Sequence, residues 1–354
     1  MAPVVGIVAN PVSARDIRRV VANATSLQIA DRANILLRVL AALQACGVRD
    51  VLMMPENGGI RAHVERGMMR ARSRGEDIYP ALHPVAMPIT GTVADTHRAT
   101  AEMRRAGVSA LVVLGGDGTH RAVAAECGTV PIAGISTGTN NAFPEHREPT
   151  ITGLATGLAV TGRVPPHIAF TANKRIDVSL INGANGGAVT EMALVDVALV
   201  TERYIGARAL WRTENFRELY VTFADPEVIG MSAIAGLLEP VGRDESGGLM
   251  VRLSPDGDCR KAATTLHAPI APGMMARVGI TDWRRMPADV AFVPEVTAGS
   301  IALDGERELS FSERDRLSLT LRDDAFRTVN VAAVMRHAGQ NRLLTGTPVP
   351  VAAF

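Results

Sequence analysis

The sequence predicts an α/β N-terminal domain with a mainly parallel sheet, followed by a β-rich sandwich C-terminal domain. First, strand and helix patterns alternate through about the first 145 residues, which is typical of a parallel sheet wrapped by helices. Second, after a break at residues 163–166, the chain reads as short strands separated by turn residues. Third, a length of 354 residues provides material for more than one hydrophobic core.

The elements of the first domain follow from its hydrophobic patterns. Apolar residues three and four apart predict a helix over residues 31–46, which Gly47 ends. By the same reasoning, further helices are expected at residues 60–72, 96–105 and 120–126. Buried-type strands are expected at residues 4–9, 51–54, 85–89, 111–114 and 130–135.

The second half of the chain is dominated by strand patterns. They are expected at residues 176–181, 192–200, 219–223, 249–253, 276–280 and 317–321. Asp304-Gly305 predicts a tight hairpin turn within residues 300–310, because this dipeptide tolerates positive φ. A helix is expected from about residue 331 to Gly339. We therefore place the domains at residues 1–165 and 166–330, with a tail at 331–354 that packs back on the first domain.

Composition excludes several classes of protein. A net charge of +1 and 4% aromatic residues provide neither the field nor the stacking platforms of a nucleic-acid-binding protein. Three cysteines far apart in sequence form neither a disulfide framework nor a zinc motif, which favours a reducing cytoplasm. No signal peptide and no membrane span are predicted. The expected partner is a small-molecule nucleotide, and a homo-oligomer is expected.

The most informative stretch is residues 111–121, LVVLGGDGTHR. An apolar strand runs into Gly115, Gly116, Asp117, Gly118 and Thr119, and a helix pattern follows at once. Glycines at such a junction allow positive φ and close approach of a ligand, and the N–H groups that begin the helix favour an anion such as phosphate. A carboxylate beside phosphates suits Mg²⁺ binding or proton transfer from a hydroxyl. The alternative is a turn whose Asp and Thr only cap the helix.

Two more loops follow predicted strands of the same sheet. Residues 135–145, ISTGTNNAFPE, contain Gly138, Thr139, Asn140 and Asn141, whose amides suit ribose hydroxyls or an adenine edge. The other loop begins at Asn10 and contains a polar, basic cluster at the strand end, where open α/β sheets bind ligands. Its members are Ser13, Arg15, Asp16, Arg18 and Arg19. Both loops also fit ordinary solvated turns.

These segments resemble the ATP-NAD kinase superfamily, in which GGDGT after an apolar strand is shared with diacylglycerol and sphingosine kinases. The opening GIVANPVSARDIRR, the GISTGTNNAFPE loop and GARALW at residues 206–211 are similar to its acetoin catabolism protein X-like branch. The resemblance covers nearly the whole chain. It implies a β-sandwich second domain, which SIALDGERELS followed by RLSLTL fits.

The resemblance also implies roles for individual residues. Asp117 matches the motif Asp that activates the acceptor hydroxyl or organises the metal, and its neighbouring glycines and Thr119 match the phosphate-facing turn. Asp196 matches the acidic member of the Asn-Glu or Asn-Asp pair that holds ribose in NAD kinases, but Val195 replaces the Asn. Residues 230–234 only echo the family's Gly-Ser-Thr-Ala-Tyr segment. These departures lie on the acceptor side, whereas the phosphate-facing turn matches the family.

The expected function is therefore an Mg²⁺-dependent phosphotransfer from ATP to a hydroxyl of NAD or another small metabolite, with a link to acetoin catabolism. His120, Arg121, Arg18 and Arg19 are candidates to balance phosphate charge. One alternative is a non-catalytic sensor or accessory protein that binds NAD(H) or ATP. A remote alternative is a serine hydrolase, because Gly134 to Gly138 matches G-x-S-x-G around Ser136, with Asp196 or Asp225 and His267 downstream.

Overall fold

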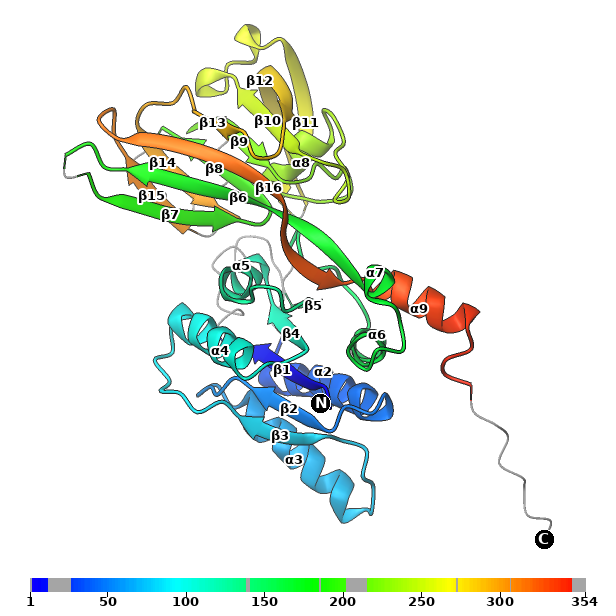
Figure 1. The fold of residues 1–354 in the computed structure, drawn as a ribbon. Coiled ribbons are helices and arrows are strands. Elements are labelled where there is room, and N and C mark those ends of the chain that lie inside the picture. The colour runs from blue at the N-terminus through cyan, green and yellow to red at the C-terminus, as the bar shows by residue number, and fades with distance from the viewer. Residues whose placement is uncertain are drawn as a thin grey trace.

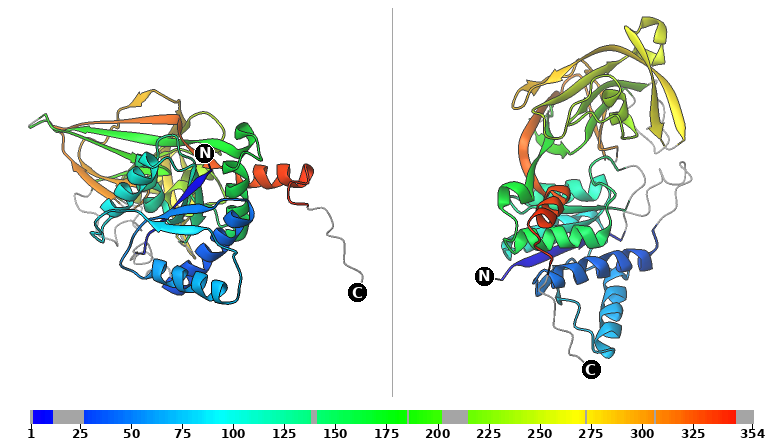
Figure 2. Two further views of the ribbon diagram at one scale, coloured as in Figure 1. Left: turned by 60° about the horizontal axis from the view of Figure 1, so that its bottom comes forward. Right: turned by 90° about the vertical axis from the view of Figure 1, so that its right-hand side faces the viewer.

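The described residues form two bodies, and a pair of long strands that belong to the larger of two β-sheets joins them (Figure 1). The computed structural model describes residues 2–11, 27–137, 141–184, 186–201, 215–271, 273–305 and 307–345. The joining strands are β6 (Phe170–Ile181) and β16 (Arg316–Val329), which run antiparallel to each other. The side view in Figure 2 shows them passing from one body into the other.

The first sheet has the strand order β3-β2-β1-β4-β5-β16-β6-β7, with β13 (Ala291–Phe292) paired to β16. Its parallel part consists of β1 (Val4–Ala9), β2 (Asp50–Met53), β3 (Ala81–Pro84), β4 (Ala110–Gly115) and β5 (Ile132–Ser136). Thr328 of β16 pairs in parallel with Ile132. From there the sheet continues antiparallel through β6 and β7 (Ala188–Ala193).

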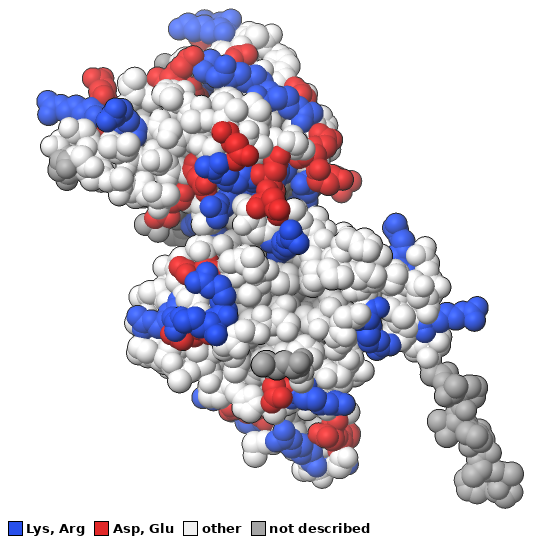
Figure 3. Space-filling model, viewed as in Figure 1, with Lys and Arg blue, Asp and Glu red and all other residues white. Residues whose placement is uncertain are grey.

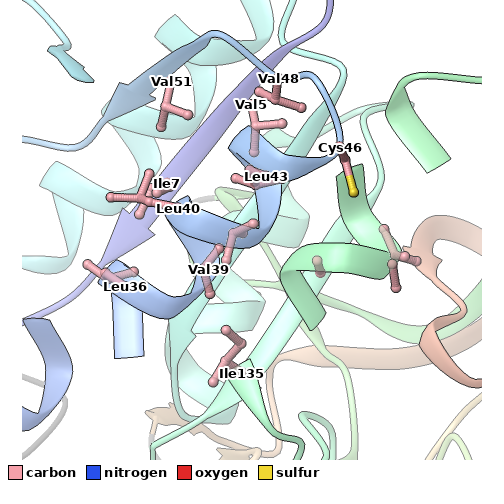
Figure 4. Packing of buried hydrophobic residues seen from close by; sticks show 14 of the residues in the cluster. Val5, Ile7, Leu36, Val39, Leu40, Leu43, Cys46, Val48, Val51 and Ile135 are labelled. Carbon is pink, nitrogen blue, oxygen red and sulfur yellow. The ribbon is translucent and has the colours of Figure 1, made fainter. Parts of the chain in front are cut away.

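Helices cover both faces of the parallel part, so its strands are buried on both sides. One face packs against α2 (Ile29–Ala45), α3 (Ile60–Ser73), α6 (Pro149–Val160) and α9 (Val331–Gln340). Figure 4 shows this core, where Leu36, Val39 and Leu43 of α2 lie near Val5 and Ile7. The opposite face packs against α4 (Val93–Arg105) and α5 (Asp117–Glu126). The short helix α7 (Pro166–Ala169) leads into β6 and contacts α9.

The second sheet is antiparallel and forms a sandwich with the antiparallel part of the first. Its order is β11 (Thr264–Ala271), β12 (Met274–Met286), β10 (Gly248–Leu253), β9 (Phe216–Val221), β8 (Asp196–Val200), β14 (Gly299–Leu303) and β15 (Arg307–Phe311). Ile176 and Leu319 of the joining strands pack against Leu199 and Ile301. The short helix α8 (Met231–Gly236) covers the other face. The predicted fold class, an α/β domain followed by a β-sandwich, is confirmed.

Several predicted elements differ from the observed ones. The third strand lies at residues 81–84 rather than 85–89, because Ala81 to Pro84 pair with Asp50 to Met53 at the sheet edge despite their polar His83. The single strand expected at 192–200 is two strands in different sheets, β7 and β8. The strand β11 was not predicted. The helix expected from His120 begins at Asp117 instead.

The predicted domain limits remain predictions. The expected boundary at residue 165 falls immediately before α7, and β16 brings the end of the second half back to β5. Among the described residues, no helix is both long and apolar enough to cross a membrane. On the face that Figure 3 shows, basic and acidic side chains are interspersed, in keeping with the net charge of +1.

Candidate nucleotide site

The candidate site lies at the carboxyl ends of β1, β4 and β5. The order of the parallel strands reverses between β1 and β4, which is the point where open α/β sheets form a ligand crevice. Asn10 follows β1, and its side-chain amide lies 3.5 Å from the hydroxyl of Thr119, the third residue of the helix after β4. The first strand loop and the GGDGT turn therefore meet.

The glycines of the GGDGT turn are required for close packing rather than for positive φ. Gly116 has φ −95° and ψ −172°, and Gly118 lies in helix α5, so the positive φ that glycine allows is not used here. A Cβ on Gly115 would lie 2.5 Å from Thr119 Cβ, and one on Gly116 would lie 2.8 Å from Asn141 Oδ1. The turn is compact because no side chain separates these groups.

Asp117 is the first residue of α5 and is 7% exposed. Its Oδ2 accepts a hydrogen bond from the backbone N–H of Ala142, and its Oδ1 accepts one from the N–H of Phe143, both at 3.0 Å. A carboxylate in the first helical turn also interacts favourably with the helix dipole. These contacts fix the carboxylate between the β4–α5 turn and the loop after β5.

Of the four residues predicted to bind a nucleotide in the loop after β5, the structure describes one, Asn141, and it lies beside the GGDGT turn. Its side-chain amide donates to Ser136 Oγ at 2.9 Å. Gly138, Thr139 and Asn140 lie outside the described residues. After Ser136 the next described helix, α6, begins only at Pro149, whereas a nucleophile elbow requires a helix directly after its Ser.

Asp196 begins β8 and is connected to the first body through Asp304. Asp304 Oδ1 accepts from the backbone N–H of Asp196 at 3.2 Å, and the Asp304 N–H donates to the Asp196 carbonyl at 2.9 Å. Arg121, one helical turn after Asp117, donates to the Leu303 carbonyl at 2.6 Å and lies 3.3 Å from Asp304 Oδ2. The hairpin tip of the second sheet is thus held against α5.

The residues expected to balance phosphate charge were His120, Arg121, Arg18 and Arg19, and the two that the structure describes make other contacts. Arg121 is paired with Asp304. His120 is fully buried, its Nδ1 lies 2.9 Å from the Gly116 carbonyl, and burial lowers its pKa to about 4. It is therefore neutral at neutral pH and does not supply a positive charge. The basic cluster that includes Arg18 and Arg19, and the segment 206–211, lie outside the described residues.

Sequence reasoning missed Arg243, which reaches the site from the loop after α8. Its guanidinium donates to the carbonyls of Ala142 and Phe143 and lies 4.0 Å from the ring centroid of Phe223. Burial lowers the pKa of Arg243 from its usual range. No motif within residues 239–248 predicts this contact, because it forms only when the two halves of the chain pack together.

One carboxylate next to bound phosphates is a common way to hold Mg²⁺, and Asp117 has this position relative to the turn. Among the described residues, no group of three or more His, Cys, Asp or Glu side chains is placed to hold a metal ion.

Comparison with known proteins identifies relatives of both halves. Residues 5–163 match the family model of the ATP-NAD kinase N-terminal domain, and residues 174–324 match that of the acetoin catabolism protein X C-terminal domain. The chain is 56% identical over 353 residues to acetoin catabolism protein X of Cupriavidus necator, covering 99% of this chain and 97% of that one. Its fold is similar to the crystal structure of yeast NADH kinase complexed with NADH. That likeness has a TM-score of 0.53 and 12% identity, over 99% of this chain and 90% of the kinase.

Proposed function

The chain belongs to the acetoin catabolism protein X family, and we propose that it is a phosphotransferase that moves a phosphate from ATP to a hydroxyl of NAD or another small metabolite. The observation that carries this proposal is the position of Asp117. Its carboxylate is fixed by two backbone amides at the start of a helix, beside glycines that pack without side chains. The N-terminal ATP-NAD kinase match supports the same chemistry.

In this proposal, the donor phosphates lie over Gly115 to Thr119, where the first N–H groups of α5 face an anion. Asp117 faces the acceptor hydroxyl, orients it and receives its proton. Mg²⁺ held by Asp117 and the phosphates would neutralise charge on the transferred group. Positioning and charge stabilisation dominate phosphoryl transfer, so a weakly basic carboxylate is sufficient. Asn10 and Asn141 border this space from the two neighbouring loops.

The second candidate is a protein that binds NAD(H) or ATP without phosphorylating anything. In the resemblance to NAD kinases, Val195 corresponds to the Asn of their ribose pair, and it is 2% exposed. Its backbone N–H donates to Asp304 Oδ1 at 2.8 Å. A buried valine cannot bond a ribose hydroxyl, so this observation favours either another acceptor or a sensor. A role in acetoin catabolism is compatible with both.

We expect the protein to be a cytoplasmic homo-oligomer. Cys46, Cys127 and Cys259 are free thiols, and the first two are buried, which suits a reducing compartment. Light scattering of the purified protein measures the oligomeric state.

The test is phosphate transfer by the wild type and by Asp117→Asn. Purified protein is incubated with ATP, Mg²⁺ and NAD, NADH or small alcohols, and phosphorylated products are identified by mass spectrometry. We expect turnover to fall by about 10²- to 10⁴-fold in Asp117→Asn while the fold and nucleotide binding persist. Unchanged turnover in this variant would contradict the proposed catalytic role of Asp117.

Asp95→Asn is the matched control. Asp95 also lies in the first turn of a helix on the same sheet face, where it accepts from the N–H groups of Thr90 and Gly91. We expect its turnover to equal that of the wild type. Thermal stabilisation by ATP, NAD and NADH, with and without Mg²⁺, separates the two candidates. Stabilisation by NAD(H) alone, without any phosphorylated product, favours the sensor.

A further inference from the structure

A buried lysine anchors the loop that carries Arg243. Lys174, on β6, is 5% exposed, and its ammonium donates to the carbonyls of Gly242, Glu245 and Gly247 at 2.9, 2.7 and 2.7 Å. Burial lowers its pKa to about 8, so it remains mostly protonated at neutral pH. Three acceptors around one ammonium fix the backbone of residues 242–247.

The second joining strand holds the same loop from its other end. Asp323 of β16 accepts from the backbone N–H of Gly247 at 3.0 Å and from Ser246 Oγ at 2.5 Å. Lys174 and Asp323 lie where the pairing register of β6 and β16 shifts, between Arg322 and Phe326. This irregularity is on the strand pair that connects the two bodies (Figure 1). Loop 242–247 is thus fixed to the connection.

Arg243 extends from this anchored loop to the peptide group that holds Asp117. The Ala142 carbonyl, which accepts from Arg243, and the Phe143 N–H, which donates to Asp117 Oδ1, belong to one peptide unit. A charged donor on the carbonyl polarises that unit and strengthens donation by its N–H. Arg243 also packs over the ring of Phe223, which limits its movement.

We propose that Arg243 is a positioning residue, which sets the Ala142–Phe143 peptide against the carboxylate of Asp117, and that Lys174 keeps Arg243 in register. The inference rests on the proposed function for its catalytic consequence, but its structural part stands by itself. Because loop 242–247 is fixed to β6 and β16, the connection between the two bodies is coupled to the orientation of Asp117.

The test compares Arg243→Met, Arg243→Lys and Lys174→Met in the full chain. The first readout is hydrogen exchange of the Ala142 and Phe143 amides. We expect it to accelerate about tenfold or more in Arg243→Met, with the amides of β4 unchanged. The second readout is turnover with ATP and the acceptor used by the wild type. We expect kcat to fall about 10- to 100-fold while KM for ATP stays within about twofold.

The graded variants sharpen the result. Arg243→Lys keeps the charge but loses the planar fork, so we expect intermediate exchange and intermediate kcat. Lys174→Met is expected to shift both readouts in the same direction as Arg243→Met. Arg285→Met is the matched control, because Arg285 contacts Glu239, Pro240 and Glu245 from the exposed side. We expect it to leave both readouts unchanged.

Exchange and turnover can each overturn the inference. Unchanged exchange at Ala142 and Phe143 in Arg243→Met contradicts it. Equally accelerated exchange throughout β4 and α5 also contradicts it, because that result marks a general loss of stability. Accelerated local exchange with unchanged kcat contradicts the role of Arg243 in positioning Asp117 for catalysis. A wild type that transfers no phosphate refutes the proposed function instead, and exchange still decides whether Arg243 positions this peptide.

Discussion

Two of the Asp-Gly dipeptides in this chain, Asp117-Gly118 and Asp304-Gly305, form turns with different roles. Asp117 begins a helix after a parallel strand, and two amides of the neighbouring loop hold its carboxylate. Asp304 has φ +49° and lies in the turn between β14 and β15. Its carboxylate accepts from the N–H groups of Leu194, Val195 and Asp196 and pairs with Arg121.

This difference indicates that one aspartate contributes mainly to catalysis and the other mainly to stability. Asp117 is placed by a local strand–turn–helix unit at the crevice of the sheet. Asp304 joins segments 108 to 183 residues away in sequence, and its side chain is fully buried. We therefore expect changes at Asp117 to affect turnover more than folding. Changes at Asp304 should affect folding first.

The largest expected effect on stability is that of Asp304→Ala. This change leaves Arg121 mostly buried without its carboxylate and removes the acceptor of three backbone amides. Breaking a buried ion pair by removing one partner costs about 3–5 kcal/mol. Denaturant unfolding monitored by circular dichroism measures the loss.

Asp289→Ala is the matched control for this prediction. Asp289 also has positive φ, 60°, and also pairs with an arginine, Arg322, but its side chain is 71% exposed. An exposed pair contributes about 0–1 kcal/mol, and both variants share the backbone cost of Ala at positive φ. Equal losses in the two variants would contradict the structural role of Asp304.

A second prediction concerns pH and His120, which bonds the turn that carries Asp117. Burial lowers its pKa to about 4, below the value of 6.5 for an unperturbed histidine. The unfolded chain therefore binds a proton that the folded chain does not as pH falls through this window. We expect His120 to reduce the free energy of unfolding by about 3 kcal/mol between pH 8 and pH 4.

His120→Leu tests this by removing the titrating group. At pH 8 the variant should be the less stable protein, because it loses the hydrogen bond to the Gly116 carbonyl. This difference in unfolding free energy should shrink as pH falls. Only the wild type then loses stability, because its unfolded chain binds a proton at His120 that its folded chain does not. A difference in unfolding free energy that stays constant from pH 8 to pH 4.5 would show that His120 is not the titrating group.

The contrast between the two turns also explains what the sequence could predict. The apolar strand followed by GGDGT predicts a turn and a helix, and Asp-Gly between apolar strands predicts a hairpin. Both signals are local. Two other contacts depend on how the two bodies pack, so local sequence patterns do not predict them. They are the pairing of Asp304 with Arg121 and the hydrogen bond from Arg243 to Phe143, 100 positions earlier.

Even within the local unit, the sequence left open why the turn contains glycines. Glycine at a strand–helix junction allows positive φ, but Gly116 is extended, and the Asn141 amide occupies the space that a side chain at Gly116 would need. That neighbour comes from the loop after β5, which sequence placed nearby but without atomic detail. Whether the glycine serves conformation or packing was therefore not readable from the chain.

The smallest expected effect tests this packing role. Ala fits the extended conformation of Gly116, so Gly116→Ala should cost only what is needed to displace Asn141 Oδ1 from 2.8 Å, about 1–3 kcal/mol. In an Asn141→Ala background the same substitution should cost less than about 0.5 kcal/mol, because the obstructing amide is gone. Thermal unfolding of the four proteins in this cycle measures the coupling. If the two costs are equal, Gly116 is required for its backbone, and the turn at Asp117 is set by conformation rather than by its contact with the loop after β5.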